Sequence, residues 1–200
     1  MWHSRAPIAD YNATRSRFFS EYGFQSFPEY ASVLRFAPEE RDWDIESEVM
    51  MAHQRGGDFA NMRIRQYLED EYWPARDFRT FLYMSHVLQG DAIKTAIEAH
   101  RRDKPYCWGS LFWQHNDCWP VASWASRDWY GRWKAQHYFA RPAFDDILVS
   151  PLAEGNTLNV RLVSDRRKTV RGKLRITVMD MDGALLSENT RSLTVAPNAS

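Results

Sequence analysis

The residue best placed to do chemistry is Glu21, a carboxylate that follows two aromatic side chains and stands two positions before Gly23. This pattern predicts a strand over residues 16–22 that presents a charged group at its end and then turns. A carboxylate costs free energy in an apolar setting unless it is paired or used. Glu21 is therefore either half of a structural ion pair with Arg17 or Arg35, or the nucleophile or general base of a site.

A second aromatic-rich segment, residues 111–120, contains Trp113 and the polar pair Asn116 and Asp117. The run 106–113 that leads into it is apolar and bounded by turn signals, which predicts a fully buried strand. Two such strand ends indicate one polar pocket between them. Asn116 and Asp117 are expected to fix the loop through turn hydrogen bonds rather than to contact a ligand.

Tryptophan is the compositional outlier, with nine in 200 residues. Indole is flat, apolar and carries one N–H donor, so it suits the C–H face of a sugar ring as well as a protein core. For most of the six tryptophans between positions 108 and 133, packing is the expected role. These six are Trp108, Trp113, Trp119, Trp124, Trp129 and Trp133.

Charge, hydropathy and cysteine content argue against several classes of partner and cofactor. The 26 basic residues balance the 26 acidic ones, so no nucleic-acid partner is expected. No apolar run approaches the roughly 20 residues that span a bilayer, so no membrane partner is expected either. Cys107 and Cys118 are too few for a disulfide framework or a zinc cluster, and the histidines show no metal-ligand spacing. No metal and no cofactor are therefore expected, and no compartment is indicated.

The elements that must position these residues alternate between strand and helix. After the first strand, residues 27–58 are predicted to be irregular, with a short helix near 45–51. A helix over 59–72 follows, then a longer one that Asp77 caps and that ends near Arg102. The second strand and a last helix over 130–141 complete the order, which is the unit of a parallel sheet with covering helices.

Beyond Pro142 the apolar and polar residues alternate, which predicts antiparallel β structure. The run 181–184, Met-Asp-Gly-Ala, predicts a hairpin turn because Asp-Gly tolerates positive φ. About five strands are expected, fewer than the usual seven of a closed sandwich. The clearest candidates are 144–148, 157–163, 174–179 and 192–195.

Two motifs carry a family resemblance. Residues 19–28, Phe-Ser-Glu-Tyr-Gly-Phe-Gln-Ser-Phe-Pro, resemble the nucleophile strand of glycoside hydrolase family two, in its β-mannosidase branch. Residues 112–124 and 130–139 resemble the same branch. The motifs stand in the order and at about the separation that the family uses for barrel strands seven and eight. The resemblance covers roughly residues 1–142 and continues more weakly beyond.

The resemblance implies an α/β plus all-β fold. Residues 1–142 would be the last quarter of a (β/α)8 TIM barrel, with strands seven and eight and their helices. Residues 143–200 would be an incomplete immunoglobulin-like β-sandwich. A complete barrel needs eight strands and about 250 residues, so the chain is expected to be a C-terminal fragment whose partner is the missing N-terminal part of the same polypeptide.

The resemblance also implies a retaining exo-glycosidase that hydrolyses terminal β-D-mannosyl residues of a β-mannoside or oligosaccharide, with Glu21 as the nucleophile. Such enzymes need a second carboxyl about 5–5.5 Å away as acid/base. In the family this is a glutamate after an asparagine at the end of strand four, and no Asn-Glu precedes Glu21. The acid/base is therefore expected outside this chain, which would be inactive alone.

Two further substrate-binding residues follow from the resemblance. Trp113 resembles the aromatic that stacks on the terminal sugar, with barrel packing as the alternative. His3 resembles a residue that contacts the nucleophile, with a surface position as the alternative. Arg132 and Lys134, on the last predicted helix, are expected on a solvated face.

Other functions stay open. The chain could be a non-catalytic carbohydrate-binding or interaction module, since it keeps the aromatics without the acid/base. A β-galactosidase-like or β-glucuronidase-like specificity is the other alternative. The continuation of each motif, residues 25–28 and 116–120, favours the mannosidase branch.

Overall fold

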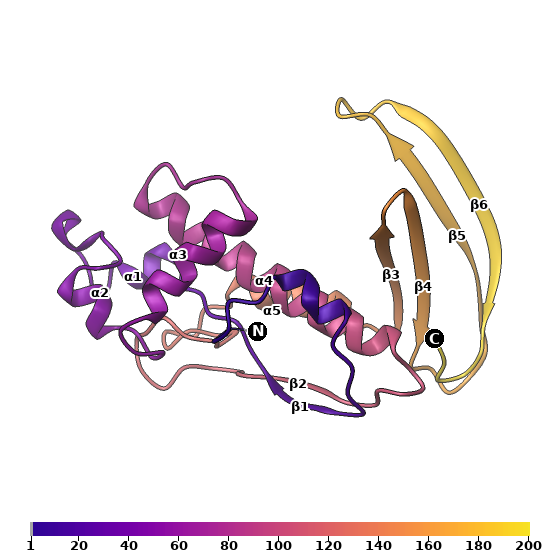
Figure 1. Ribbon diagram of the computed structural model, residues 1–200, viewed down its shortest axis with the longest axis horizontal. Helices are drawn as coiled ribbons and strands as arrows, with labels where there is room; N and C mark the ends of the chain where they lie inside the picture. The colour runs from indigo at the N-terminus through magenta and orange to yellow at the C-terminus, as the bar shows by residue number, and fades with distance from the viewer. Residues whose placement is uncertain (1) are drawn as a thin grey trace.

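The computed structural model describes residues 2–200 and consists of a helical part with one pair of strands, followed by two β-hairpins (Figure 1). Met1 lies outside the described residues. The elements are η1 (Ile8–Asn12), β1 (Phe19–Tyr22), α1 (Tyr30–Val33), η2 (Glu40–Asp42), α2 (Glu48–Ala52), α3 (Ala60–Glu71), α4 (Phe78–Arg102), β2 (Ser110–Phe112), α5 (Ala135–Ala143), β3 (Ile147–Glu154), β4 (Thr157–Ser164), β5 (Val170–Met179) and β6 (Leu185–Val195).

Strands β1 and β2 pair in parallel, with Phe19 opposite Ser110. The chain between them passes through α3 and α4, as a parallel connection requires, so the predicted strand–helix–strand unit is present. β2 is shorter than the predicted 106–113, and Leu111 within it is 54% exposed. Within residues 2–200, β2 pairs with β1 alone. The prediction of a fully buried strand is therefore wrong for this chain, because β2 lacks a second neighbour here.

The long helix α4 runs alongside the strand pair and carries the shorter helices at one end (Figure 1). Its start is fixed by Asp77, whose carboxylate accepts a hydrogen bond from the Thr80 backbone N–H at 2.7 Å, which satisfies a donor that the first turn leaves free. The helix ends at Arg102, and α3 lies inside the predicted range 59–72. Both helix predictions are confirmed.

The segment 27–58 is less irregular than predicted, since it contains α1, η2 and α2. Helix α2 begins after Ser47, whose hydroxyl accepts a hydrogen bond from the Met50 N–H at 3.3 Å. It therefore starts three residues later than the predicted helix near 45–51. Helix α5 likewise begins at Ala135, later than predicted.

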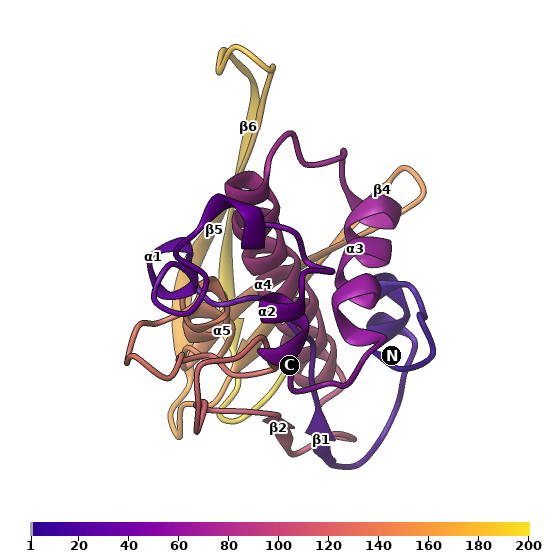
Figure 2. The same cartoon turned by 90° about the vertical axis from the view of Figure 1, so that its left-hand side faces the viewer.

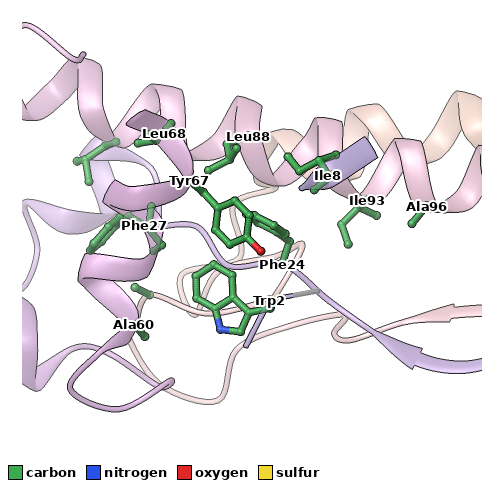
Figure 3. Packing of buried hydrophobic residues seen from close by; sticks show 14 of the residues in the cluster. Trp2, Ile8, Phe24, Phe27, Ala60, Tyr67, Leu68, Leu88, Ile93 and Ala96 are labelled. Carbon is green, nitrogen blue, oxygen red and sulfur yellow. The ribbon is translucent and has the colours of Figure 1, made fainter. Parts of the chain in front are cut away.

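The core lies between β1, α3 and α4 and begins with the N-terminal residues (Figure 3). Trp2 stacks on Tyr67 with ring centroids 5.8 Å apart, and both rings meet Phe24 edge-on, at 5.1 Å and 4.6 Å. The Tyr67 hydroxyl donates to the Ala6 carbonyl at 3.0 Å. This cluster holds the start of the chain against the end of β1.

The β region consists of two antiparallel hairpins, β3–β4 and β5–β6. They stand opposite each other in Figure 1, and the β5–β6 hairpin extends beyond the rest of the chain in Figure 2 as well. Gly183, in the turn between β5 and β6, has φ +87°, so the predicted Asp-Gly hairpin is confirmed. Four strands form in this region, fewer than the five expected, but β5 and β6 are longer than predicted.

The C-terminal end of α4 fastens the hairpins to the helical part. Arg101 is 6% exposed and donates to the Asp145 carbonyl at 2.8 Å and to the Asp165 carboxylate at 3.0 Å. Lys104 pairs with the same Asp165 carboxylate. The basic last turn that was predicted from the sequence therefore anchors the β region.

Candidate functional site

A cavity of about 560 Å³ opens beside the end of β1. All three residues predicted for the site, Glu21, Trp113 and His3, line it. They come from β1, from the residue that follows β2, and from the N-terminal segment. The complete lining is Trp2, His3, Tyr11, Thr14, Phe19, Glu21, Tyr22, Gly23, Trp113 and Trp124.

Glu21 presents an exposed carboxylate to this cavity. Neither arginine proposed as its structural partner pairs with it: the Arg17 guanidinium lies 5.1 Å from the centre of the Tyr106 ring, and that of Arg35 lies 4.1 Å from the Tyr130 ring. Within residues 2–200, no hydrogen bond or ion pair engages the Glu21 carboxylate. The carboxylate is therefore free to act on a ligand.

The strand that carries Glu21 is held from behind by His100 of α4. The imidazole stacks on Phe19 with centroids 3.5 Å apart, and its Nδ1 lies 2.9 Å from the Ser110 hydroxyl. That hydroxyl is 2.7 Å from the Tyr22 hydroxyl. Phe19 and Tyr22 thus pack toward α4 on either side of Glu21. Burial lowers the pKa of His100 to about 4, so the ring is neutral near pH 7.

Gly23 lets the two walls of the cavity approach each other. A Cβ at this position would lie 2.6 Å from the Trp113 carbonyl oxygen and 2.8 Å from Cδ1 of Trp124, closer than side chains tolerate. The Trp113 N–H donates to the Tyr22 carbonyl at 2.7 Å. Trp113 therefore stands directly beside the end of β1, and only glycine fits between the walls.

Trp113 is 42% exposed, so its indole is accessible from the cavity in this chain. The Arg55 guanidinium lies 5.9 Å from its centre, within the range of a weak cation–π contact. An exposed indole at the wall of a cavity suits the apolar face of a sugar ring. Trp124 shares the lining and also packs against the core, the role expected for most of the six tryptophans.

His3 also lines the cavity and is exposed. Its backbone carbonyl accepts a hydrogen bond from Arg63 at 3.0 Å, and its ring lies 6.1 Å from that of Phe59. In the described part of the chain no hydrogen bond joins His3 to Glu21. The two residues line the same cavity, and a contact between His3 and Glu21 stays a prediction.

Lys134 lies in a buried position, which contradicts the prediction of a solvated face. It was expected on a solvated face, but its side chain is fully buried and its ammonium donates to the carbonyls of Ser26 and Ser123, at 3.0 Å and 3.1 Å. Burial lowers its pKa to about 8. Arg132 is partly exposed and donates to the Ser32 hydroxyl at 3.1 Å. Sequence periodicity does not predict the burial of Lys134, because its partners Ser26, Ser123 and Asp117 are distant in sequence.

The loop after Trp113 has the structural role predicted for Asn116 and Asp117. The Asn116 amide donates to the Asp117 carbonyl at 3.0 Å. The Asp117 carboxylate is buried and accepts a hydrogen bond from the Ser123 hydroxyl at 2.6 Å. Burial raises the pKa of Asp117, while the Lys134 ammonium opposes that shift. Neither residue lines the cavity.

The chemistry of the cavity is limited to a single acidic group. Of the residues that line it, Glu21 alone carries a carboxylate. Among residues 2–200 no group of three or more His, Cys, Asp or Glu side chains is arranged to hold a metal ion. The same described residues include no helix long and apolar enough to cross a bilayer. The site offers one free carboxylate between aromatic walls.

Comparison with known proteins extends over the whole chain. A family model described as "Mannosidase Ig/CBM-like domain" matches residues 156–200. The β-mannosidase of Rattus norvegicus is 32% identical over 174 residues, which are 81% of this chain and 20% of that protein. Beta-mannosidase B of Aspergillus niger is 27% identical over 199 residues, 91% of this chain and 24% of its own length.

Solved structures are similar to this chain over nearly its whole length. The β-D-mannosidase of Dictyoglomus thermophilum superposes on 100% of this chain with a TM-score of 0.89 and 30% identity, and the match covers 24% of that protein. An exo-chitosanase of Amycolatopsis orientalis matches 97% of the chain and 25% of its own length, with a TM-score of 0.75 and 16% identity, which shows a shared fold alone.

The chain therefore spans about a fifth to a quarter of the length of these relatives. The match includes both the strand that carries Glu21 and the hairpins near the C-terminus, since the Dictyoglomus structure covers every element. By sequence and by fold, the chain belongs to the β-mannosidase branch of glycoside hydrolase family two.

Proposed function

We propose that this chain is the nucleophile-bearing part of a retaining exo-β-mannosidase, and that Glu21 is the nucleophile. The observation that carries the proposal is the free Glu21 carboxylate on the same cavity as the exposed Trp113 ring. Both residues lie in the motifs that resemble the family. The relatives named β-mannosidase support the substrate class.

The chemistry would proceed in two displacements. A Glu21 oxygen attacks the anomeric carbon as the bond to the leaving oxygen breaks, which forms a glycosyl-enzyme ester. An acid protonates the leaving oxygen, then removes a proton from the water that cleaves the ester. Trp113 would stack on the apolar face of the terminal sugar. His3, which lines the same cavity, is proposed as a further substrate contact.

The acid/base must come from elsewhere in the polypeptide, because Glu21 is the sole carboxylate that lines the cavity. We propose that residues 1–142 are strands seven and eight of a TIM barrel with their helices. Residues 143–200 would then begin an immunoglobulin-like sandwich. The parallel β1–β2 pair and the two antiparallel hairpins support this division, and α5 ends at Ala143, next to the boundary.

The test uses a completed barrel, defined here as this chain fused to the part of the Dictyoglomus thermophilum enzyme that precedes the matched region. We expect it to hydrolyse an aryl β-mannoside. Glu21→Gln should lower kcat at least about a thousandfold, because covalent catalysis is lost. A matched control is Glu48→Gln, which alters an exposed carboxylate on α2 and should leave kcat unchanged.

A second readout identifies the nucleophile directly. Adding azide to Glu21→Gly should restore turnover and release a glycosyl azide, because the small anion replaces the missing carboxylate at the anomeric carbon. Undiminished hydrolysis by Glu21→Gln, together with no azide product from Glu21→Gly, would remove Glu21 from the mechanism. Aryl β-galactoside and β-glucuronide run in parallel test the alternative specificities.

A non-catalytic carbohydrate-binding module is the second candidate, favoured by a cavity with several aromatic walls and a single carboxylate. Calorimetry of the 200-residue chain with mannose and manno-oligosaccharides tests it. Heat that saturates at or below millimolar ligand, and that is lost in Trp113→Ala, supports binding by this chain alone. No heat up to the millimolar range excludes it.

A further inference from the structure

Lys134 lies directly behind the junction of the two cavity walls. Its Nζ donates to the carbonyls of Ser26 and Ser123 at 3.0 Å and 3.1 Å. These two residues also pair with each other, the Ser26 N–H with the Ser123 carbonyl at 3.0 Å and the reverse at 3.1 Å. One amine thus reinforces the backbone bridge that joins the segment after β1 to the loop after β2.

Each tied residue leads into a wall of the cavity. Ser26 stands three residues after Gly23, which continues the strand of Glu21. Ser123 directly precedes Trp124, whose ring would lie 2.8 Å from a Cβ at Gly23. A shift at the Ser26–Ser123 bridge would therefore move the indole wall relative to Glu21.

A backbone hydrogen bond and two buried carboxylates also hold Lys134 in this position. Its own N–H donates to the Ser126 carbonyl at 2.8 Å, just before α5 begins. The Asp117 and Asp128 carboxylates attract its charge, and both are buried. Asp128 is in turn held by the Ser32 hydroxyl and by the Arg132 N–H, the latter at 2.8 Å.

Burying an ammonium group costs free energy of desolvation, which an apolar side chain does not lose. The desolvation penalty of a buried charge commonly exceeds the electrostatic stabilisation that its partners provide. Proteins in which apolar residues of similar volume replace such charges are often as stable. Lys134 has no contact with the cavity itself, so catalysis by its amine is excluded. What distinguishes it from an apolar residue is the ability to hold two backbone carbonyls at once.

We propose that Lys134 is a positioning residue: by tying the Ser26 and Ser123 carbonyls together, it sets the placement of Trp124 and Trp113 against Glu21. The catalytic part of this inference rests on the proposed function. The geometric part does not, because it concerns the position of two tryptophans in this chain.

The geometric test uses the 200-residue chain labelled with 5-fluorotryptophan, with fluorine resonances assigned by single Trp→Phe substitutions. Lys134→Met keeps the length of the side chain and removes the amine. We expect the Trp124 and Trp113 resonances to shift or broaden, while that of Trp73, which is 88% exposed, stays in place. Lys173→Met, an exposed lysine on β5, is the matched control and should leave all three unchanged.

The catalytic test uses the completed barrel. Lys134→Met should lower kcat about tenfold to a hundredfold, because small misplacements of reacting groups have effects of that size, with a smaller change in KM. The assay is run well below the midpoint of thermal unfolding of each variant. Lys134→Gln, which keeps an N–H₂ donor and also serves if the methionine variant does not fold, should show a smaller loss.

The outcomes are distinguishable. If the Trp113 and Trp124 resonances shift in the 200-residue chain but the completed barrel does not need Glu21, the tie is retained and the proposed function is discarded. Resonances of Trp113 and Trp124 that match those of Lys173→Met would overturn the inference. In a completed barrel that does need Glu21, an unchanged kcat in folded Lys134→Met would overturn the catalytic part of the inference.

Discussion

The imidazole of His100 stacks on the ring of Phe19, with centroids 3.5 Å apart and planes inclined by 10°. This contact joins the last turn of α4 to the strand that carries Glu21. The other ring nitrogen, Nε2, is buried and has no hydrogen-bond partner in the described part of the chain. A second proton on the ring would create a buried positive charge with no partner at Nε2, so the contact depends on pH.

Acidification should weaken folding through His100. Burial lowers its pKa to about 4, from an ordinary value near 6.5 in the unfolded chain. Between these values the unfolded state binds the proton and the folded state does not, so the stability present above pH 6.5 falls as the pH drops toward 4. We expect His100→Leu to remove about 2 kcal/mol of that pH dependence, measured by urea unfolding at pH 7 and pH 4.5.

The control for this pH dependence is His115→Gln, because His115 is exposed. Its urea midpoints should follow those of the unmodified chain at both pH values. His86 is also buried with its pKa lowered to about 4, so some acid sensitivity remains after His100 is replaced. A slope in His100→Leu equal to that of the control would contradict the prediction.

Gly23→Ala should displace the cavity walls. Its Cβ would meet the Trp113 carbonyl oxygen at 2.6 Å and Trp124 at 2.8 Å, and a backbone oxygen moves less easily than a side-chain tip. We expect a loss of about 1–3 kcal/mol in the free energy of unfolding, with altered near-ultraviolet circular dichroism. Gly172→Ala on β5 has open space around its new Cβ, and its stability should not fall. Equal stabilities of the two variants would argue against the close approach.

Local patterns account for what the sequence predicted correctly. The cap at Asp77 and the apolar period of α4 lie within one continuous segment, so neighbours in sequence are enough to define the helix. The hairpin turn at Gly183 is equally local. Glu21 and Trp113 were assigned to one pocket because parallel strands place their carboxyl ends together, and the structure brings both to one cavity.

Long-range contacts explain what the sequence could not show. Lys134 is buried because the carboxylates of Asp117 and Asp128, from the loop that precedes α5, offset its charge. His100 is one of several basic residues at the end of α4 in the sequence. In the structure it contacts Phe19 of β1 and Ser110 of β2. The sequence neighbours of His100, Ala99 and Arg101, do not indicate those partners.

Lys134 should make stability rise at high pH. Its pKa is lowered to about 8 in the folded chain, against about 10.4 in an unfolded one. Above pH 8 the folded state loses the proton while the unfolded state keeps it, so folding gains stability until both are neutral. Relative to Lys134→Met, the unmodified chain should gain about 2 kcal/mol between pH 8 and pH 9.5. Urea unfolding at both pH values measures this, and Lys173→Met should show no such gain.

Arg101→Met should release the β region from α4. The buried guanidinium donates to the Asp145 carbonyl at 2.8 Å and to Asp165 at 3.0 Å, and also to the Ala143 carbonyl. Removing it takes the donor from the buried Ala143 carbonyl and the partly buried Asp145 carbonyl, at a cost of about 3 kcal/mol in the free energy of unfolding. Because the acceptors lie where α5 gives way to β3, protease cleavage between residues 143 and 147 should accelerate. Arg171→Met, an exposed arginine on β5, should be cleaved there at the rate of the unmodified chain, and a similar rate in Arg101→Met would show that the hairpins are held by other contacts.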